Sequence, residues 1–123
     1  MKIIPINNLT FGYKSVLKTE WLKGNMPSVK VDMDGNLLTK NNVTNGHMLA
    51  KSKGGKTNIS NLMLETANYN FMKGNKPFSS FFNKEKFDAY CEQFKDIKLP
   101  NFDGLDYINK ITQTAKNLLR QGR

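Results

Sequence analysis

His47, Asn61 and Asn70 are the side chains of this sequence whose types and spacing could do chemistry. Fourteen positions separate His47 from Asn61, and nine separate Asn61 from Asn70. The loop after the histidine contains Gly54-Gly55, and Lys73-Gly74 follows the last asparagine. His47 is the only histidine in the chain. An unperturbed imidazole, with a pKa of ~6.5, is mostly neutral near pH 7, as a general base must be.

The stretch from Thr44 to Lys76 resembles the HNH endonuclease motif. In that family a strand ends on a histidine, a glycine-rich loop follows, a second strand opens with asparagine, and a short helix carries the last histidine or asparagine. The resemblance implies metal-dependent hydrolysis of a DNA phosphodiester by nicking or cleavage, with His47 as the general base. It also implies that Asn61 holds the loop that carries His47, and that Asn70 is a ligand of one divalent metal, Mg²⁺ or Mn²⁺.

Gly46 departs from the family pattern. The family usually has Asp, Glu or another His before the motif histidine, where that residue helps to hold the metal. Without it, Asn70 is the only side-chain ligand that the motif supplies, and a neutral amide alone binds a hard divalent cation weakly. Either a carboxylate from elsewhere takes the place, with Asp32, Asp34 and Glu65 as candidates, or phosphate and water hold the metal, or catalysis has been lost.

The charge of the chain indicates a polyanionic partner. The net charge is +9 and the isoelectric point is near 9.7, values that are typical of proteins that meet nucleic acid. Between His47 and Lys76, Glu65 is the only acidic residue, against five lysines that we expect to contact phosphate: Lys51, Lys53, Lys56, Lys73 and Lys76. Such contacts would make binding to DNA weaken steeply with salt. A second basic group lies near the end of the chain: Lys110, Lys116, Arg120 and Arg123.

Composition sets further bounds. With 123 residues, of which 38% are hydrophobic and 24% charged, we expect one folded domain over residues 1–123. The single cysteine, Cys91, rules out an internal disulfide, and the Cys-x-x-Cys pairs of a structural zinc site are missing. Helices must then stabilise the motif. No long apolar run indicates a signal or a membrane span, so we expect a protein of the cytoplasm, that of the host cell if it is a phage protein.

Sequence periodicity predicts an α+β fold that contains the ββα-metal motif. We expect an N-terminal helix over Tyr13–Lys23, stopped by Gly24, and then a small hairpin that turns at Asp34-Gly35. The motif core, about residues 41–76, should hold strands at Val43–Met48 and Leu62–Leu64. A short helix over Ala67–Lys73 should follow, with Thr66 as N-cap and Gly74 as its stop.

The remaining part, residues 77–123, should be mainly helical. One helix is expected from Lys84 to about Ile97, and Phe78, Phe81 and Phe82 before it are expected in the core. A last helix should open at Asp103 and present one apolar stripe, formed by Leu105, Ile108, Ile111, Ala115, Leu118 and Leu119. These two helices are expected to cover the motif sheet.

Two other functions stay open at this stage. A catalytically weakened HNH scaffold could bind nucleic acid or a protein partner and act as a regulator or inhibitor of a nuclease, for example against a host defence. Gly46 is the feature that favours this alternative. A plain DNA-binding module fits the charge, but it leaves the spacing of His47, Asn61 and Asn70 unexplained.

Overall fold

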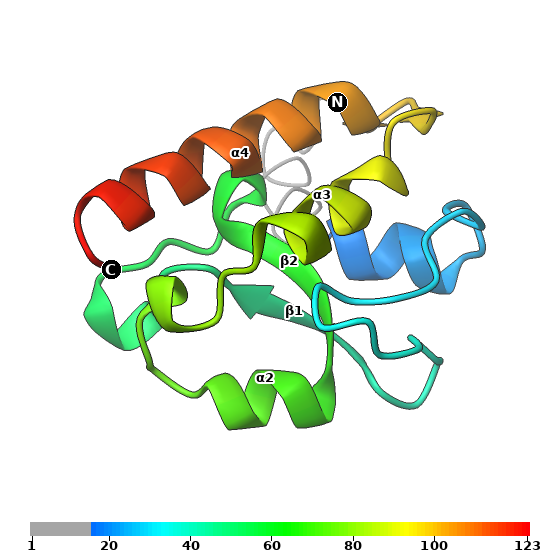
Figure 1. Cartoon of the computed structure of the whole chain (residues 1–123). Coiled ribbons are helices and arrows are strands. Elements are labelled where there is room, and N and C mark those ends of the chain that lie inside the picture. Colours follow the sequence, from blue (N-terminus) through cyan, green and yellow to red (C-terminus); the bar gives the residue numbers. More distant parts are fainter. Residues whose placement is uncertain (1–15) are drawn as a thin grey trace, which may run out of the picture.

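The computed structural model describes residues 16–123 and shows an α+β protein, as the sequence predicts (Figure 1). The predicted N-terminal helix is present over residues 16–22, and its first expected residues, Tyr13–Ser15, lie outside the described residues. The main elements that follow are β1 (Val43–His47), β2 (Leu62–Thr66), α2 (Ala67–Lys73), α3 (Lys84–Glu92) and α4 (Gly104–Arg120).

The two motif strands form an antiparallel hairpin that leads directly into α2. Val43 pairs with Thr66 and His47 with Leu62. Thr66 then caps the helix, because its side chain accepts a hydrogen bond from Tyr69 N, and Gly74 ends the helix with a φ of 52°. The predicted strand, strand, helix order is therefore confirmed, with β2 two residues longer than expected.

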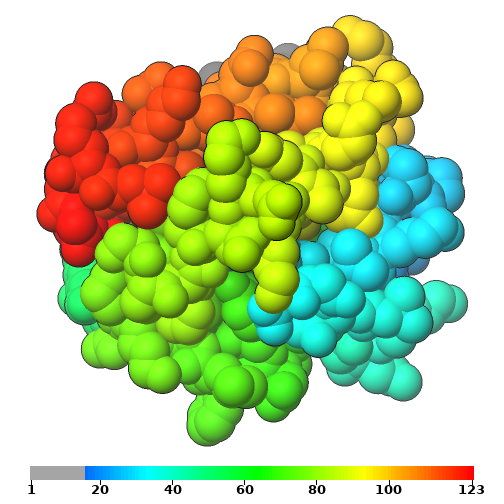
Figure 2. Space-filling view, in the orientation of Figure 1, coloured from blue at the N-terminus to red at the C-terminus, as the bar shows by residue number. Residues whose placement is uncertain are grey.

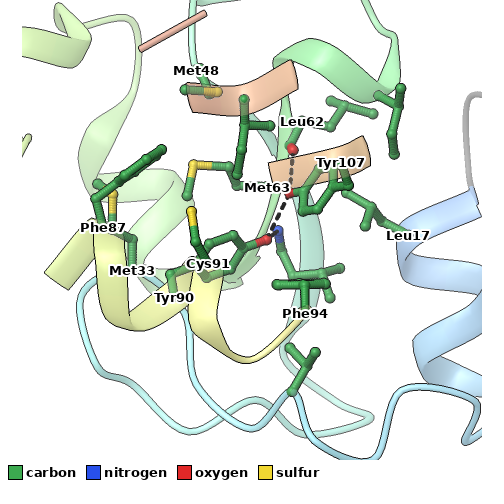
Figure 3. Packing of buried hydrophobic residues seen from close by; sticks show 14 of the residues in the cluster. Leu17, Met33, Met48, Leu62, Met63, Phe87, Tyr90, Cys91, Phe94 and Tyr107 are labelled. Atoms are coloured by element: carbon green, nitrogen blue, oxygen red, sulfur yellow. Dashed lines mark hydrogen bonds between the residues drawn. The ribbon is translucent and has the colours of Figure 1, made fainter. Parts of the chain in front are cut away.

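The hairpin lies between α2 on one side and α3 and α4 on the other (Figure 1). The outer edge of β2 has no third strand within the described residues, and side chains satisfy its backbone instead. Tyr90 Oη accepts from Leu64 N at 2.8 Å, and Tyr107 Oη donates to Leu62 O at 2.7 Å (Figure 3). The hydroxyls lie 2.9 Å apart. Since Tyr107 uses its only proton on Leu62, Tyr90 is the donor between them.

The carboxylate of Asp32 bonds the same edge of β2 at its last residue, Thr66. Its Oδ2 accepts from both the backbone N and the Oγ1 of Thr66, each at 3.0 Å, while Oδ1 accepts from Asp34 N and Asn36 N. These bonds make a buried charge tolerable. They also fix the turn at residues 32–36 against the start of α2.

One cluster of buried apolar side chains joins residues from the N-terminal helix to α4. The aromatic rings of Tyr90, Phe94 and Tyr107 lie at its centre, with centroids 4.9 Å apart for both pairs that include Phe94. Cys91 is buried, as predicted. Phe78 is buried as well, and Phe81 and Phe82 pack against the cluster. In Figure 2 the chain after α2, in yellow-green, crosses the middle of the visible face, between α2 below and α4 above.

Three elements differ from expectation. The small hairpin reduces to a turn and one isolated bridge between Val31 and Leu37. Helix α3 ends at Glu92, because the side chain of Gln93 bonds the backbone of residues 30 and 31 and the chain turns there.

A two-residue ribbon that the sequence did not predict, β3 (Lys98–Leu99) and β4 (Phe102–Asp103), then leads to α4. On α4 the buried face opens with Tyr107, whereas Leu105 is 52% exposed. None of the helices in the described part of the chain is long and apolar enough to cross a bilayer.

Candidate active site

Asn61 holds together the loop between the motif strands. Its Oδ1 accepts from Leu49 N at 2.9 Å, and its Nδ2 donates to Leu49 O at 3.1 Å and to Lys56 O at 2.9 Å. The side chain is buried, and its loss would remove all three bonds that tie the loop to the end of β1. The contacts agree with the role that the sequence assigns to Asn61.

The glycine pair after His47 permits the tight path of this loop. Gly54 ends the short 3₁₀ turn Lys51–Lys53 with a φ of 93°, a conformation that favours glycine. Gly55 passes so close to the backbone that a Cβ atom there would lie 1.8 Å from Leu49 O. The loop therefore folds back tightly against the residues that follow β1.

His47 is the last residue of β1, and its side chain is half-buried. Its Nε2 lies 2.9 Å from Thr57 Oγ1, a partner that the sequence analysis did not single out. Burial lowers the pKa of His47 below its ordinary value, and the positive charges of Lys51 and Lys73 lower it further. The imidazole is thus held neutral at pH 7, the form that can accept a proton.

We expect NMR to show this lowered pKa directly, because the chain has a single histidine. The ring protons of His47 should titrate with a midpoint below the ordinary ~6.5. Lys51→Gln should raise that midpoint, since the substitution removes a nearby positive charge. Lys116→Gln, on the exposed side of α4, is the matched control and should leave it unchanged. A midpoint at or above 6.5 in the parent protein would contradict this account.

Asn70 lies on α2, which packs against the hairpin. Its Nδ2 donates to Thr44 Oγ1 at 3.1 Å, and the same hydroxyl donates to Glu65 O at 2.8 Å. This bond turns the amide nitrogen toward β1 and directs the carboxamide oxygen Oδ1 away from Thr44. Thr44 therefore connects Asn70 to the strand pair, three residues before His47.

Glu65 occupies the space beside Gly46 that a side chain at residue 46 would need. A Cβ atom on Gly46 would lie 1.8 Å from Glu65 Oε1. The Glu65 side chain is 2% exposed, and burial raises the pKa of its carboxyl to about 7 against the opposing effect of Lys73. Of the three carboxylates considered from the sequence, Asp32 is taken up by its turn, and the exposed Asp34 pairs with Lys86 at 3.1 Å.

Lys73 differs from the other four lysines of the motif. Its ammonium is buried, donating to Glu65 Oε2 at 2.6 Å and to the His47 carbonyl at 3.0 Å. Lys73 was expected to contact phosphate. In this structure its ammonium instead bonds Glu65 and the His47 carbonyl inside the protein. The remaining four lysines are all exposed: Lys51, Lys53, Lys56 and Lys76.

The structure thus gathers the predicted residues into two connected groups. Asn61 and the loop hold the chain after His47, while Asn70, Glu65 and Lys73 lie at the hairpin and α2. Within residues 16–123 no hydrogen bond joins the imidazole to Asn70. Lys73 links the groups instead, since it lies on the same helix as Asn70 and bonds the His47 carbonyl.

The donor groups at α2 suit a hard divalent cation in type, because carboxylate and carboxamide oxygens are the ligands that Mg²⁺ prefers. No set of three or more His, Cys, Asp or Glu side chains that could hold a metal occurs in the described part of the chain. Two buried side-chain oxygens have no hydrogen-bond partner among the described residues, Asn45 Oδ1 and Glu65 Oε1. The one that belongs to a carboxylate, and so bears on a cation, is Glu65 Oε1.

Comparisons with protein-family models, with curated proteins and with solved structures found no match for this chain.

Proposed function

We propose that this protein is a metal-dependent endonuclease of the HNH type that hydrolyses DNA phosphodiester bonds. The observation that carries the proposal is the hydrogen bonding of Asn61, which fixes the loop after His47 through three backbone contacts. A strand pair, a loop held in this way and a helix that carries Asn70 occur in the order that the motif requires.

In this proposal His47 removes a proton from the attacking water. The lowered pKa of the imidazole supports that role at neutral pH. Thr57 orients the ring through Nε2. Asn70 Oδ1 would be a ligand of one Mg²⁺ or Mn²⁺, whose charge, when the ion is bound, offsets the negative charge of the phosphate. Asn61 acts as a positioning residue and does not touch the substrate.

The experiment that tests the proposal is a nicking assay. Purified protein is incubated with supercoiled plasmid in Mg²⁺ or Mn²⁺, and EDTA is the control. We expect metal-dependent conversion to the open circular form. Absence of cleavage with either metal, across pH 6 to 9, would contradict the proposal.

The exposed lysines of the loop should supply a salt-dependent part of DNA binding. Replacing Lys51, Lys53 and Lys56 together by Gln should lower the slope of log affinity against log salt by about 0.9 for each lost phosphate contact. Fluorescence anisotropy of a labelled duplex in EDTA measures binding without cleavage.

A matched triple variant controls for the loss of charge alone. Lys84, Lys95 and Lys98 are exposed lysines that pair with Asp88, Glu92 and Asp103, so their charges are already locally balanced. Replacing them by Gln should change the slope much less. Equal slopes for the two triple variants would remove the loop from the DNA interface.

A second function is favoured by the buried Glu65–Lys73 pair together with Gly46. The Lys73 ammonium on α2 is already paired with the Glu65 carboxylate on β2, and this fits a scaffold that has lost catalysis and binds DNA or a nuclease as a regulator. That reading expects a complex with DNA or a protein partner that survives His47→Ala, in a protein that does not nick plasmid.

The obvious rescue of a silent site, Gly46→Asp alone, is not informative. Any side chain at residue 46 collides with Glu65, because its Cβ would lie 1.8 Å from Oε1. The carboxylate can be moved to β1 only if Glu65 is shortened at the same time. The informative variant is therefore the double substitution Gly46→Asp with Glu65→Ala.

A further inference from the structure

We infer that Glu65 is the carboxylate ligand of the divalent metal site, entering from β2 in place of the acidic residue that is missing before His47. This inference rests on the proposed nuclease function, because that function is what gives the metal a role. The ligand it assigns is a property of this chain, which has the glycine, Gly46, on β1 and the acid, Glu65, on β2.

The side chain of Glu65 closely approaches Gly46. Thr44 pairs with Glu65 across the hairpin, and Gly46 is two residues further along β1 on the same face. The glutamate reaches diagonally across to residue 46, where its Oε1 lies 1.8 Å from the position of a Cβ atom. Gly46 is thus the residue type that leaves room for this carboxylate.

A second observation is the unpaired oxygen. Glu65 is buried to 1% exposure, and its Oε1 has no hydrogen-bond partner among residues 16–123, while Oε2 accepts from Lys73 at 2.6 Å. Leaving a buried carboxyl oxygen without a partner is costly. A bound cation would satisfy that oxygen without breaking the bond to Lys73.

A third observation is the neighbouring amide. Thr44 Oγ1 bonds both Asn70 Nδ2 and Glu65 O, so the helix residue and the strand residue are fixed to one hydroxyl. Thr44 thus holds Asn70 beside the main chain of Glu65. The inference assigns Asn70 Oδ1 and Glu65 Oε1 as two oxygen ligands of the kind that Mg²⁺ and Mn²⁺ prefer, with phosphate and water completing the shell.

The test measures binding of Mn²⁺ alone, without DNA. Free Mn²⁺ has a strong electron paramagnetic resonance signal that decreases when the ion binds protein. The parent protein should bind one Mn²⁺, and Glu65→Gln should weaken the affinity by about tenfold or more, as the loss of an anionic ligand predicts. Glu85→Gln, an exposed acid at the start of α3, is the matched control and should bind as the parent does.

Two further variants guard against a folding artefact. Gly46→Ala should also weaken Mn²⁺ binding, because the added methyl group displaces the carboxylate without changing any charge. Gly46→Asp with Glu65→Ala should restore binding to within a few-fold of the parent, since it returns a carboxylate to the same space. Circular dichroism of each variant checks that the fold is retained.

The outcomes separate this inference from the nuclease proposal. Unchanged Mn²⁺ affinity in folded Glu65→Gln, or no Mn²⁺ binding by the parent, would overturn the assignment of Glu65. If the parent nicks DNA but Glu65→Gln binds Mn²⁺ normally, the inference fails and the function stands. If Glu65→Gln and Gly46→Ala lose Mn²⁺ but the parent never nicks DNA, the ligand assignment stands and the nuclease function fails.

Discussion

His47→Ala should abolish metal-dependent nicking of supercoiled plasmid, with a loss of about 10²–10⁴-fold in rate, the range expected for a general base. The substitution removes the only imidazole of the chain. It should leave the fold intact, because the side chain is half-buried and, among residues 16–123, its ring bonds only to Thr57. The rate is measured as the conversion of supercoiled to open circular plasmid under single-turnover conditions.

The pH dependence of the parent gives this prediction a second readout. The folded-state pKa of His47 is lowered, so the neutral base is fully present above pH ~6.5 and is lost as the pH falls through the lower folded value. Nicking should therefore be flat near pH 7 and should decline only in more acidic buffer. Added imidazole should restore part of the rate to His47→Ala.

Thr57→Val is the matched control for the orientation of the ring. It removes the hydroxyl that contacts Nε2 and keeps the histidine, so its loss of rate should be much smaller than that of His47→Ala. If His47→Ala cleaves at the parent rate and EDTA stops that cleavage, the imidazole has no role in the mechanism.

Local sequence signals predict much of the motif, since its elements depend on short-range chemistry. Thr66 and Gly74 bound α2 as expected, because a cap and a left-handed stop act on neighbouring residues. The backbone hydrogen bonds of Asn61 are those that the resemblance implies. The α3 boundary could not be predicted. Phe94 continues the apolar helical spacing, but it enters the core from a turn that Gln93 begins.

The contact between Glu65 and Gly46 lies beyond such local signals. It depends on the register of two strands joined by a long loop, and on which face of the hairpin α2 covers. The sequence indicates a missing acid at residue 46 and an acid at residue 65, but it does not place the two in the same space. The glycine at residue 46 is the signal that made Glu65 one of three candidate carboxylates, and only the strand register singles it out as the one beside Gly46.

The burial of Lys73 was missed for a related reason. A lysine beside other lysines reads as a phosphate contact, whereas its ammonium bonds Glu65 and the His47 carbonyl. Charge counting treats all five lysines of the motif alike. The structure distinguishes four exposed charges, which can face DNA, from one that is part of the packing between α2 and the hairpin.

Lys73→Met should have the largest effect on stability, lowering the free energy of unfolding by about 3–5 kcal/mol at pH 8, the cost of breaking a buried ion pair. The substitution leaves the Glu65 carboxyl buried and without its partner, so that at pH 8 it must either stay charged in the interior or take up a proton, and both are costly. The folded-state pKa of Glu65, already raised to about 7 from 4.5, should rise further. The measurement is urea denaturation in EDTA, followed by the fluorescence of Trp21.

The sign of the pH dependence follows from that raised pKa. A carboxyl whose folded pKa exceeds its unfolded value contributes its full stability below about pH 4.5, and that contribution is lost as the pH rises through the folded value. The destabilisation of Lys73→Met relative to the parent should therefore be smaller at pH 5.5, where Glu65 is protonated, than at pH 8. Adding Glu65→Gln should recover much of the loss at pH 8, because the uncompensated charge is then gone.

Lys76→Met is the matched control, since Lys76 is exposed just beyond the same helix end, and it should change stability by no more than about 0.5 kcal/mol. If Lys73→Met lies within that range of the parent at pH 8, the Glu65–Lys73 pair does not hold α2 to the hairpin. A loss that is the same at pH 5.5 and pH 8, and that Glu65→Gln does not relieve, would instead assign the effect to lost packing of the lysine stem. Only a loss of stability that depends on pH and is relieved by Glu65→Gln supports the conclusion that the buried Glu65 carboxylate needs the Lys73 ammonium beside it.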